Sequence, residues 1–306
     1  MEFQLYKMNI QAAHFGDGSL EQSLPTVPAE RIFSALFIEA LKYNQSEELL
    51  NIASSPNFQM SDTMLYQDGL FLPKPIGFPE VDNNNGEYFR EDEKTIKKID
   101  FINENDFDAF VQGKYGKLNQ LNEKQRSLYS NETHTKVSIF EDPDAEGGDP
   151  YRIGTTRYKD SSLVFIATKN KLIENLMDSL QYSGIGGKRT SGLGRFQLEI
   201  EEPTSTIKER LTIDAESKVM LLTSAIPKDV ELEKALIGAK YAIAKSSGFA
   251  YSDKVRENYR KHDLYKFKAG STFEGTFTGD IVDVGPFDFE HSVLNYSKPL
   301  FLKLEV

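Results

Sequence analysis

The start of the chain alternates apolar and polar residues. Phe3, Leu5, Met8 and Ile10 stand among polar neighbours over residues 2–12, and this period of two predicts a β-strand. Glycines interrupt the pattern at residues 14–18, and apolar residues then recur at helical spacing over residues 29–41. The chain is therefore predicted to open with a strand, a loop and a helix.

The middle of the chain shows a second helix between strands. Residues 133–140 and 162–168 are rich in β-branched and aromatic residues and predict strands, residues 170–181 predict a helix, and residues 195–200 predict a strand. The segment between the first two strands is interpreted as a projecting hairpin or loop. Residues 56–80 give weak strand signals, and the polar residues 82–131 contain one short predicted helix at 104–112. We therefore expect residues 56–131 to form an insertion on the core.

The second half repeats the mixture of strands with a helix. The predicted elements are a strand at 218–225, a helical turn at 231–237, and strands near 240–245, 263–268, 271–278 and 300–306. The polar segment 201–206 contains Pro203 and marks a domain boundary. The predicted fold is α+β, with two ferredoxin-like (RRM-like) domains at residues 1–205 and 206–306.

Composition narrows the possible functions. The 306 residues contain no cysteine, which excludes disulfides, thiol nucleophiles and thiolate-bound zinc. We expect a cytoplasmic protein, because the sequence carries neither an export signal nor an apolar run of about 20 residues that could span a membrane. The formal net charge of −11 argues against nucleic acid as the sole partner, so phosphate binding would require basic residues gathered on one face.

The densest motif is a glycine-rich loop after the second predicted helix. It holds five glycines within eleven residues, namely Gly184, Gly186, Gly187, Gly192 and Gly194. Lys188, Arg189 and Arg195 add positive charge, and no acidic residue occurs between residues 184 and 198. Glycines allow backbone N–H groups to converge, so the pattern predicts an anion-binding nest. A flexible connector is the alternative interpretation.

Two nucleotide-binding motifs are excluded at this loop. A Walker-type loop needs Ser or Thr directly after Gly-Lys, and here Arg189 follows Lys188. A dinucleotide fingerprint runs from strand to helix, whereas this loop runs from helix to strand. No cofactor is predicted.

The loop is also the point at which the sequence resembles a known family. Residues 186–196, Gly-Gly-Lys-Arg-Thr-Ser-Gly-Leu-Gly-Arg-Phe, resemble the glycine-rich signature of the RAMP superfamily of CRISPR proteins. Residues 14–21 and 28–36 look like the opening of the fourth subunit of type III-A (Csm) effector complexes, and residues 245–249 and 260–273 fit the same family.

This resemblance implies a non-catalytic subunit that caps the 5′ end of the guide RNA (crRNA) and holds its repeat-derived tag. Its partners would be the large palm-domain subunit that synthesises cyclic oligoadenylate, the backbone RAMP subunit that cuts target RNA, and target RNA near the tag. A β-hairpin thumb at residues 141–160 would wedge between guide and target nucleotides. The expected RNA-binding residues are His14, Arg31, Tyr151, Arg152, Gly184, Gly186, Gly187, Lys188, Arg189, Thr190, Ser191, Gly192, Gly194 and Arg195.

Three alternatives stay open. His14 could act as a general acid or base in a metal-independent endoribonuclease that processes crRNA, or it could be a structural histidine. Tyr151 and Arg152, together with Arg157 and Tyr158, could stack a base and hold a phosphate, or could pack at the base of the hairpin. A protein-only assembly factor would bind no RNA.

No metal site is predicted. Gly147, Gly148 and Asp149 precede Pro150, which supplies no second carboxylate for a cyclase-like metal pair. The acidic run at residues 141–149 lacks the spacing of a calcium loop and is interpreted as solvated. Residues 253–263 alternate basic and acidic side chains, which favours an ordinary solvated face over an RNA groove.

Overall fold

The protein is described by a computed structural model that covers residues 1–16, 18–79, 94–114, 118–139, 148–214, 217–250, 259–287, 289 and 291–305. Helices and strands mix along the chain, which confirms the predicted α+β class. Within these residues no helix is long and apolar enough to cross a membrane.

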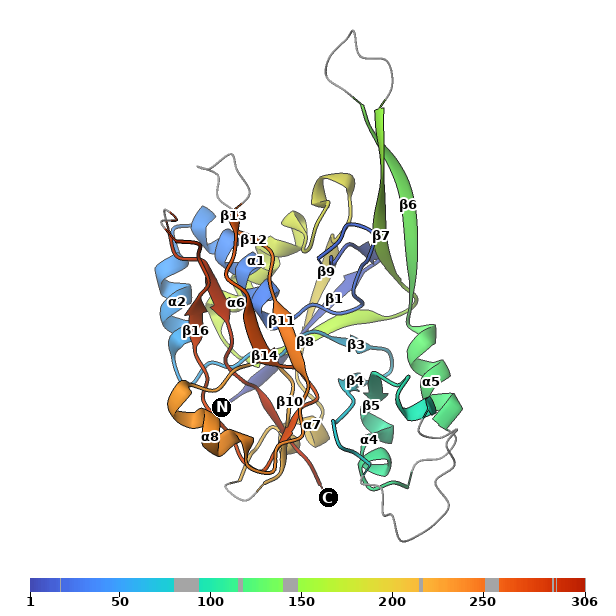
Figure 1. The fold of residues 1–306 in the computed structure, drawn as a ribbon, viewed down its shortest axis with the longest axis vertical. Helices are drawn as coiled ribbons and strands as arrows, with labels where there is room; N and C mark the ends of the chain where they lie inside the picture. The colour runs from blue at the N-terminus through green and yellow to red at the C-terminus, as the bar shows by residue number, and fades with distance from the viewer. Residues whose placement is uncertain are drawn as a thin grey trace.

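A six-stranded antiparallel sheet forms the centre of the N-terminal half (Figure 1). In spatial order its strands are β5 (Phe101–Asn103), β4 (Leu70–Pro73), β3 (Met64–Tyr66), β8 (Ser162–Thr168), β1 (Phe3–Ile10) and β9 (Phe196–Glu201). In the register between β1 and β8, Leu5 lies opposite Ile166. The strands predicted at residues 2–12, 162–168 and 195–200 are confirmed.

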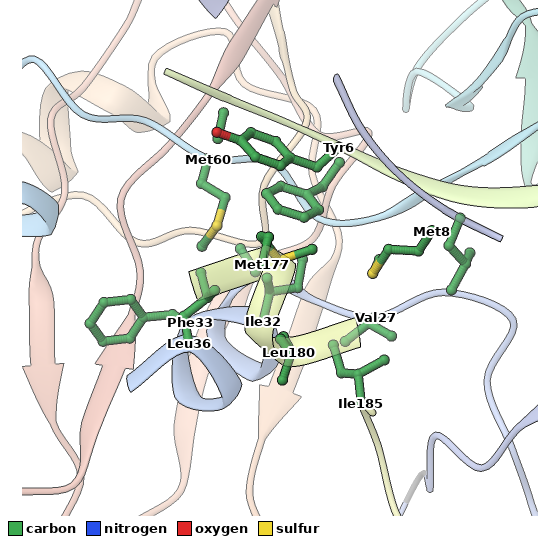
Figure 2. Close-up of a cluster of buried hydrophobic side chains, with 14 of the residues drawn as sticks. Tyr6, Met8, Val27, Ile32, Phe33, Leu36, Met60, Met177, Leu180 and Ile185 are labelled. Atoms are coloured by element: carbon green, nitrogen blue, oxygen red, sulfur yellow. The ribbon is translucent and has the colours of Figure 1, made fainter. Parts of the chain in front are cut away.

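Two long helices cover one face of this sheet. α1 (Ala29–Lys42) and α6 (Lys171–Ser183) match the helices predicted at 29–41 and 170–181, and the Asn170 side chain caps α6 by accepting the Leu172 and Ile173 amides. Figure 2 shows side chains of β1, α1 and α6 pointing into a shared core, with Tyr6 and Met8 facing Ile32 and Met177. The short helix α2 (Ser46–Ser54) follows α1 and was not predicted.

The opposite face of the sheet packs on the C-terminal half. Along β8, Leu163, Phe165 and Ala167 belong to the helix-covered core, while Val164 and Ile166 belong to a second core that also contains residues of the C-terminal strands. This alternation is the period of two expected for a strand buried on both faces. The sheet therefore separates two cores, and both halves of the chain contribute residues to each of them.

The prediction for residues 56–131 requires a correction. β3, β4 and β5 are strands of the main sheet, and α4 (Glu104–Val111), close to the predicted helix at 104–112, buries Phe107 and Phe110. α5 (Leu118–Ser127) was not predicted. The described part of residues 82–131 thus supplies core residues, because a few buried aromatic side chains suffice in a stretch that is polar on average; residues 80–93 and 115–117 lie outside the described chain.

A long hairpin rises above the rest of the molecule (Figure 1). β6 (Tyr129–Ile139) pairs with β7 (Gly148–Tyr158) from Tyr129 opposite Tyr158 to Ile139 opposite Gly148, and β2 (Ala12–Ala13) adds to the base of β7. The strand predicted at residues 133–140 is therefore shorter than β6, the first strand of the hairpin. The hairpin also begins before the predicted thumb at 141–160, and the acidic residues 141–146 lie outside the described chain.

The C-terminal half contains several small sheets. A three-stranded sheet has the order β15 (Thr272–Phe273), β10 (Val219–Leu221), β18 (Phe301–Lys303). The strand pairs are β11 (Ile243–Ser246) with β14 (Leu264–Phe267), β12 (Phe249–Ala250) with β13 (Tyr259–Arg260), and β16 (Ile281–Asp283) with β17 (Leu294–Tyr296). The helices are α7 (Ser205–Arg210), which starts inside the predicted boundary segment, and α8 (Asp229–Leu236). The division near residue 205 stays a prediction.

Candidate nucleic-acid interface

The glycine-rich loop is closed at its base by its own backbone. α6 ends at Ser183, and the Gly184 that caps it has a φ of 75°, in the left-handed region. The Ile185 amide donates to the Gly194 carbonyl at 2.9 Å. Gly194 also has a φ of 75°, and a Cβ there would overlap the Ile185 carbonyl oxygen. These two glycines are therefore required by the turn itself.

Two further glycines of the loop pack against His14. The Gly187 amide donates to the His14 carbonyl at 2.9 Å, and a Cβ on Gly187 would lie 2.8 Å from Cδ2 of the His14 ring. A Cβ on Gly186 would lie 2.8 Å from the His14 carbonyl oxygen. The close approach of His14 thus explains why Gly186 and Gly187 are glycines, and no ligand is needed for this explanation.

The tip of the loop is exposed and positively charged. Lys188 has a left-handed φ of 56°, residues Arg189–Ser191 form one 3-10 turn, and Gly192 has a φ of 85° with nothing within 4 Å of a Cβ. Arg189, Thr190, Ser191 and Arg195 are exposed. The amides of residues 184, 185, 187, 191, 192 and 194 donate to acceptors inside the protein. These six amides are therefore not available to the predicted anion-binding nest. Charged side chains are the main groups that the tip offers to an anion.

The thumb meets this tip through an aromatic residue. The Lys188 ammonium lies 5.1 Å from the centre of the Tyr151 ring, a cation–π contact between the loop and β7. Tyr151 is half-buried and lies opposite Lys136 of β6, and the neighbouring Arg152 is exposed. The structure thus brings Lys188 and Tyr151 together, whereas Arg152 belongs to the opposite face of β7 because successive side chains of a strand alternate.

The other aromatic–basic pair of the hairpin is structural. Tyr158 is buried, and its hydroxyl donates to the Pro25 carbonyl at 2.8 Å; burial also raises the pKa of this hydroxyl well above its ordinary value. The Arg157 guanidinium pairs with Glu132 at 3.1 Å. Of the two interpretations given for these residues, packing at the hairpin base is the one that the contacts favour.

His14 links three segments from a buried position. Its side chain is 5% exposed, and Nδ1 lies 2.7 Å from the Gly154 carbonyl of β7. A carbonyl only accepts, so Nδ1 is the donor in this hydrogen bond. Together with the backbone bond to Gly187, this fixes the glycine loop against the thumb.

Arg31 lies apart from the glycine loop. Its Nη1 donates to the Gly16 carbonyl at 2.8 Å, and its side chain lines a cleft of about 1120 Å³ between the two halves of the chain. Residues 18–31 and 73–76 form one side of this cleft, and residues 242–249 and 266–269 form the other. Arg31 is thus a cleft residue, separated from the loop by the segment that carries His14.

The described residues contain no group of three or more His, Cys, Asp or Glu side chains that could hold a metal ion. Asp149 lies in β7 opposite Ser138. The acidic run at 141–146 falls outside the described chain, as do residues 253–258 of the segment interpreted as a solvated face.

Comparison with known proteins identifies the family. The chain is 44% identical over 312 residues to the CRISPR system Cms protein Csm4 of Streptococcus thermophilus, and the match covers all of both chains. The chain belongs to the Csm4 family of CRISPR proteins.

Further matches extend this result. The Csm4 protein of Mycobacterium tuberculosis (strain H37Rv) is 34% identical over 99% of this chain and 98% of that protein, and a model of the CRISPR Csm4 C-terminal domain matches residues 214–304. Among solved structures, a chain from the Csm3–Csm4 subcomplex of the type III-A CRISPR-Cas interference complex matches with a TM-score of 0.64, 19% identity and coverage of 99% and 100% of the two chains. A chain from a Csm1–Csm4 cassette in complex with cA4 matches with a TM-score of 0.59, 15% identity and coverage of 100% and 99%. At these identities the structural matches establish the fold.

Four lysines of the cleft were not predicted from the sequence. Lys74, Lys245, Lys266 and Lys268 line it together with Arg31. With Arg31 these lysines come from four separate segments of the sequence, at residues 31, 74, 245 and 266–268. No local pattern marks such a set, because only the packing of the two halves brings it together.

Proposed function

We propose that this protein is the crRNA-binding subunit of a type III-A CRISPR (Csm) effector complex and holds the 5′ tag of the guide RNA. Membership of the Csm4 family supports the assignment to such a complex. The observation that carries RNA binding is the contact between Lys188 and Tyr151, which places a cation of the loop tip beside a ring that can stack a base. Backbone phosphates and unstacked bases are the two features by which proteins hold single-stranded RNA.

The proposed role is non-catalytic. A ribonuclease based on His14 would need the ring to reach the RNA, but the side chain is almost fully buried and its Nδ1 is engaged by the Gly154 carbonyl. Proton transfer to a ribose hydroxyl requires hydrogen-bond reach. The position of His14 therefore favours bracing of the loop and thumb over the alternative of crRNA processing.

We infer that the N-terminal half is a ferredoxin-like unit. Its elements follow the sequence β1-α1-β3-β8-α6-β9, and the corresponding strands lie in the order β3-β8-β1-β9, with both helices on one face. A strand-helix-strand repeat with this order is the ferredoxin-like arrangement. We propose that residues 206–306 form the second such unit, built on β10, β15 and β18.

The proposed partners follow from the relatives. Related Csm4 chains have been solved with Csm3 and with Csm1, which supports a bridge here between a backbone RAMP subunit and the large palm-domain subunit. The thumb would contact target RNA near the tag. We place the protein in the cytoplasm, where guide and target RNAs meet.

Replacing the two cations of the loop tip tests the proposal. Lys188→Ala/Arg189→Ala should weaken binding of repeat-derived single-stranded RNA regardless of sequence, because phosphate contacts position a strand without reading bases. Each lost phosphate contact on a single strand flattens the slope of log affinity against log salt by about 0.7. A matched control, Lys171→Ala/Lys234→Ala, removes two exposed charges elsewhere. Equal affinity and slope for the two double variants would remove the loop from the binding site.

A further inference from the structure

Helix α8 carries a concentration of exposed apolar side chains. Within eight consecutive positions of the described chain, four large apolar side chains are exposed, namely Val230, Leu232, Leu236 and Ile237. Val230 is 91% exposed and Ile237 is 70% exposed, and no residue of α8 is fully buried. Single exposed apolar residues are ordinary on a protein surface, whereas a local cluster of them marks an interaction site.

The opposite side of α8 is fixed to the rest of the protein. Glu231 accepts hydrogen bonds from the Lys228 amide at 3.1 Å and from the Thr278 hydroxyl at 2.9 Å. Ala235 packs on the core cluster of the C-terminal half around Phe273. The helix is therefore held in one orientation, with its apolar residues directed outward.

The charges on this outward face are acidic. At 3.6 residues per turn, Asp229 and Glu233 lie one turn apart, between the two pairs of exposed apolar side chains. No Lys or Arg of the described residues lies within ion-pair distance of either carboxylate. Like charges four residues apart on a helix repel each other, and a basic group on a partner would relieve this repulsion.

Two kinds of occupant fit this surface poorly. The two carboxylates would repel RNA, because RNA is a polyanion. In a symmetric dimer the surface would face the same surface of a second copy, which would bring the carboxylates of the two copies against each other. A protein partner that offers both basic and apolar side chains matches the charge and the apolar character of the face.

The position of α8 selects between the two proposed protein partners. In Figure 1 α8 lies low on the molecule, whereas the hairpin of β6 and β7 rises at the top. A backbone subunit that cuts target RNA has to lie along the guide RNA, and therefore near the loop tip and the thumb. Because α8 is remote from that end, its exposed face is available to the large palm-domain subunit.

We propose that the exposed face of α8 is a docking surface for basic and apolar side chains of the large palm-domain subunit. Val230 and Ile237, the most exposed apolar residues of the face, are buried by this partner, and Asp229 and Glu233 pair with its Lys or Arg side chains. The inference rests on the proposed function and assigns one of its partners to a defined place on the chain.

The test measures binding of the full-length protein to the purified palm-domain subunit by biolayer interferometry. Val230→Ser/Ile237→Ser should weaken this binding by about tenfold or more, because two apolar side chains at the centre of the contact are lost. Asp229→Lys/Glu233→Lys should also weaken it, and should slow association most at low salt, where charge complementarity acts most strongly.

A matched variant controls for the change in charge. Glu123→Lys/Asp178→Lys reverses two exposed carboxylates of α5 and α6 and should bind the palm-domain subunit like the wild-type protein. The α8 variants replace exposed side chains, so their thermal unfolding should resemble that of the wild-type protein. Their binding to the purified backbone subunit and to repeat-derived single-stranded RNA should match that of the charge control.

The outcomes separate the two claims. If the wild-type protein binds neither subunit, the proposed bridging role and the docking surface both fail. If the wild-type protein binds the palm-domain subunit and both α8 variants bind it like the charge control, the docking surface alone is overturned. Loss of binding to the backbone subunit, with palm-domain binding intact, would also overturn it. Weaker binding of both α8 variants to the palm-domain subunit alone is the expected result.

Discussion

Gly192 and Gly194 form a matched pair that separates backbone conformation from packing. Both have a left-handed φ, 85° and 75°, but a Cβ on Gly192 meets nothing within 4 Å, whereas a Cβ on Gly194 overlaps the Ile185 carbonyl oxygen. Gly192→Ala should therefore cost only the left-handed strain of an L-residue, about 1–2 kcal/mol. Gly194→Ala adds a displacement of the chain at the base of the loop.

The larger cost can be assembled from the contacts of Gly194. Its amide donates to the Ala12 carbonyl and its carbonyl accepts the Ile185 amide, each at 2.9 Å. Loss of both bonds adds about 2 kcal/mol to the strain, for a total of about 3–4 kcal/mol. A change of 1 kcal/mol moves the Tm of a domain of this size class by roughly 2–4 °C. Thermal unfolding should thus show a small shift for Gly192→Ala and a shift about two- to threefold larger for Gly194→Ala.

Equal shifts for the two alanine variants would refute this account of the loop. The pair also has a use in binding assays. Because nothing in the protein occupies the space above Gly192, a loss of RNA affinity in Gly192→Val beyond that of Gly192→Ala reports on a ligand that approaches the tip. Gly192→Val with wild-type affinity would contradict close passage of RNA at this point.

Three further predictions concern single side chains. Tyr151→Ala should cost roughly 1–3 kcal/mol of RNA binding and Tyr151→Phe almost nothing, since the ring stacks a base; equal losses in a titration would point to the hydroxyl instead. Lys298→Met should lower the free energy of unfolding by about 3 kcal/mol in denaturant titrations. The reason is that the buried Lys298 ammonium donates to three backbone carbonyls at 2.5–2.9 Å around the end of α2. A change below about 1 kcal/mol would contradict this. Burial raises the pKa of the Glu30 carboxyl, but the Lys266 ammonium and the hydrogen bonds that Glu30 accepts lower it below the ordinary value of 4.5. The ionised Glu30 therefore stabilises the fold above pH 4.5, and this stabilisation is lost as the pH falls through the folded pKa. The difference in stability between wild type and Glu30→Gln should shrink below about pH 4.5, and a constant difference would refute the assignment.

The elements that the sequence predicted well have strong local signals. α1 and α6 carry apolar residues at helical spacing, and Asn170 caps the second of them. β8 reads as an apolar run because both of its faces are buried. In these segments local pattern and tertiary environment agree, so the pattern alone places the element.

The errors lie where tertiary packing overrides composition. The segment around Phe107 and Phe110 is polar on average, yet its few aromatic side chains complete the second core. β5 is only three residues long and gives no periodic signal of its own. These elements are fixed by the surface that they cover, which a single sequence does not reveal.

The candidate site shows the same division. The density of glycines marked the loop, but the cause of Gly186 and Gly187 is the His14 backbone and ring, which lies more than 170 positions earlier in the chain. The contact between Lys188 and Tyr151 depends on the position of the thumb relative to the loop. Residue type could suggest each partner, whereas the contact itself depends on the tertiary arrangement of β7 and the loop.

In the proposed function, RNA lies along the tip of the glycine loop and the adjacent face of the thumb. The most direct test is photo-crosslinking of the full-length protein to repeat-derived RNA that carries 4-thiouridine in its 5′ segment, followed by identification of the crosslinked peptides. We expect crosslinks within residues 148–158 and 184–195, with fewer in the second segment after Lys188→Ala/Arg189→Ala. Efficient crosslinks confined to α8 or α2, with none at the loop or thumb, would contradict this placement of the RNA.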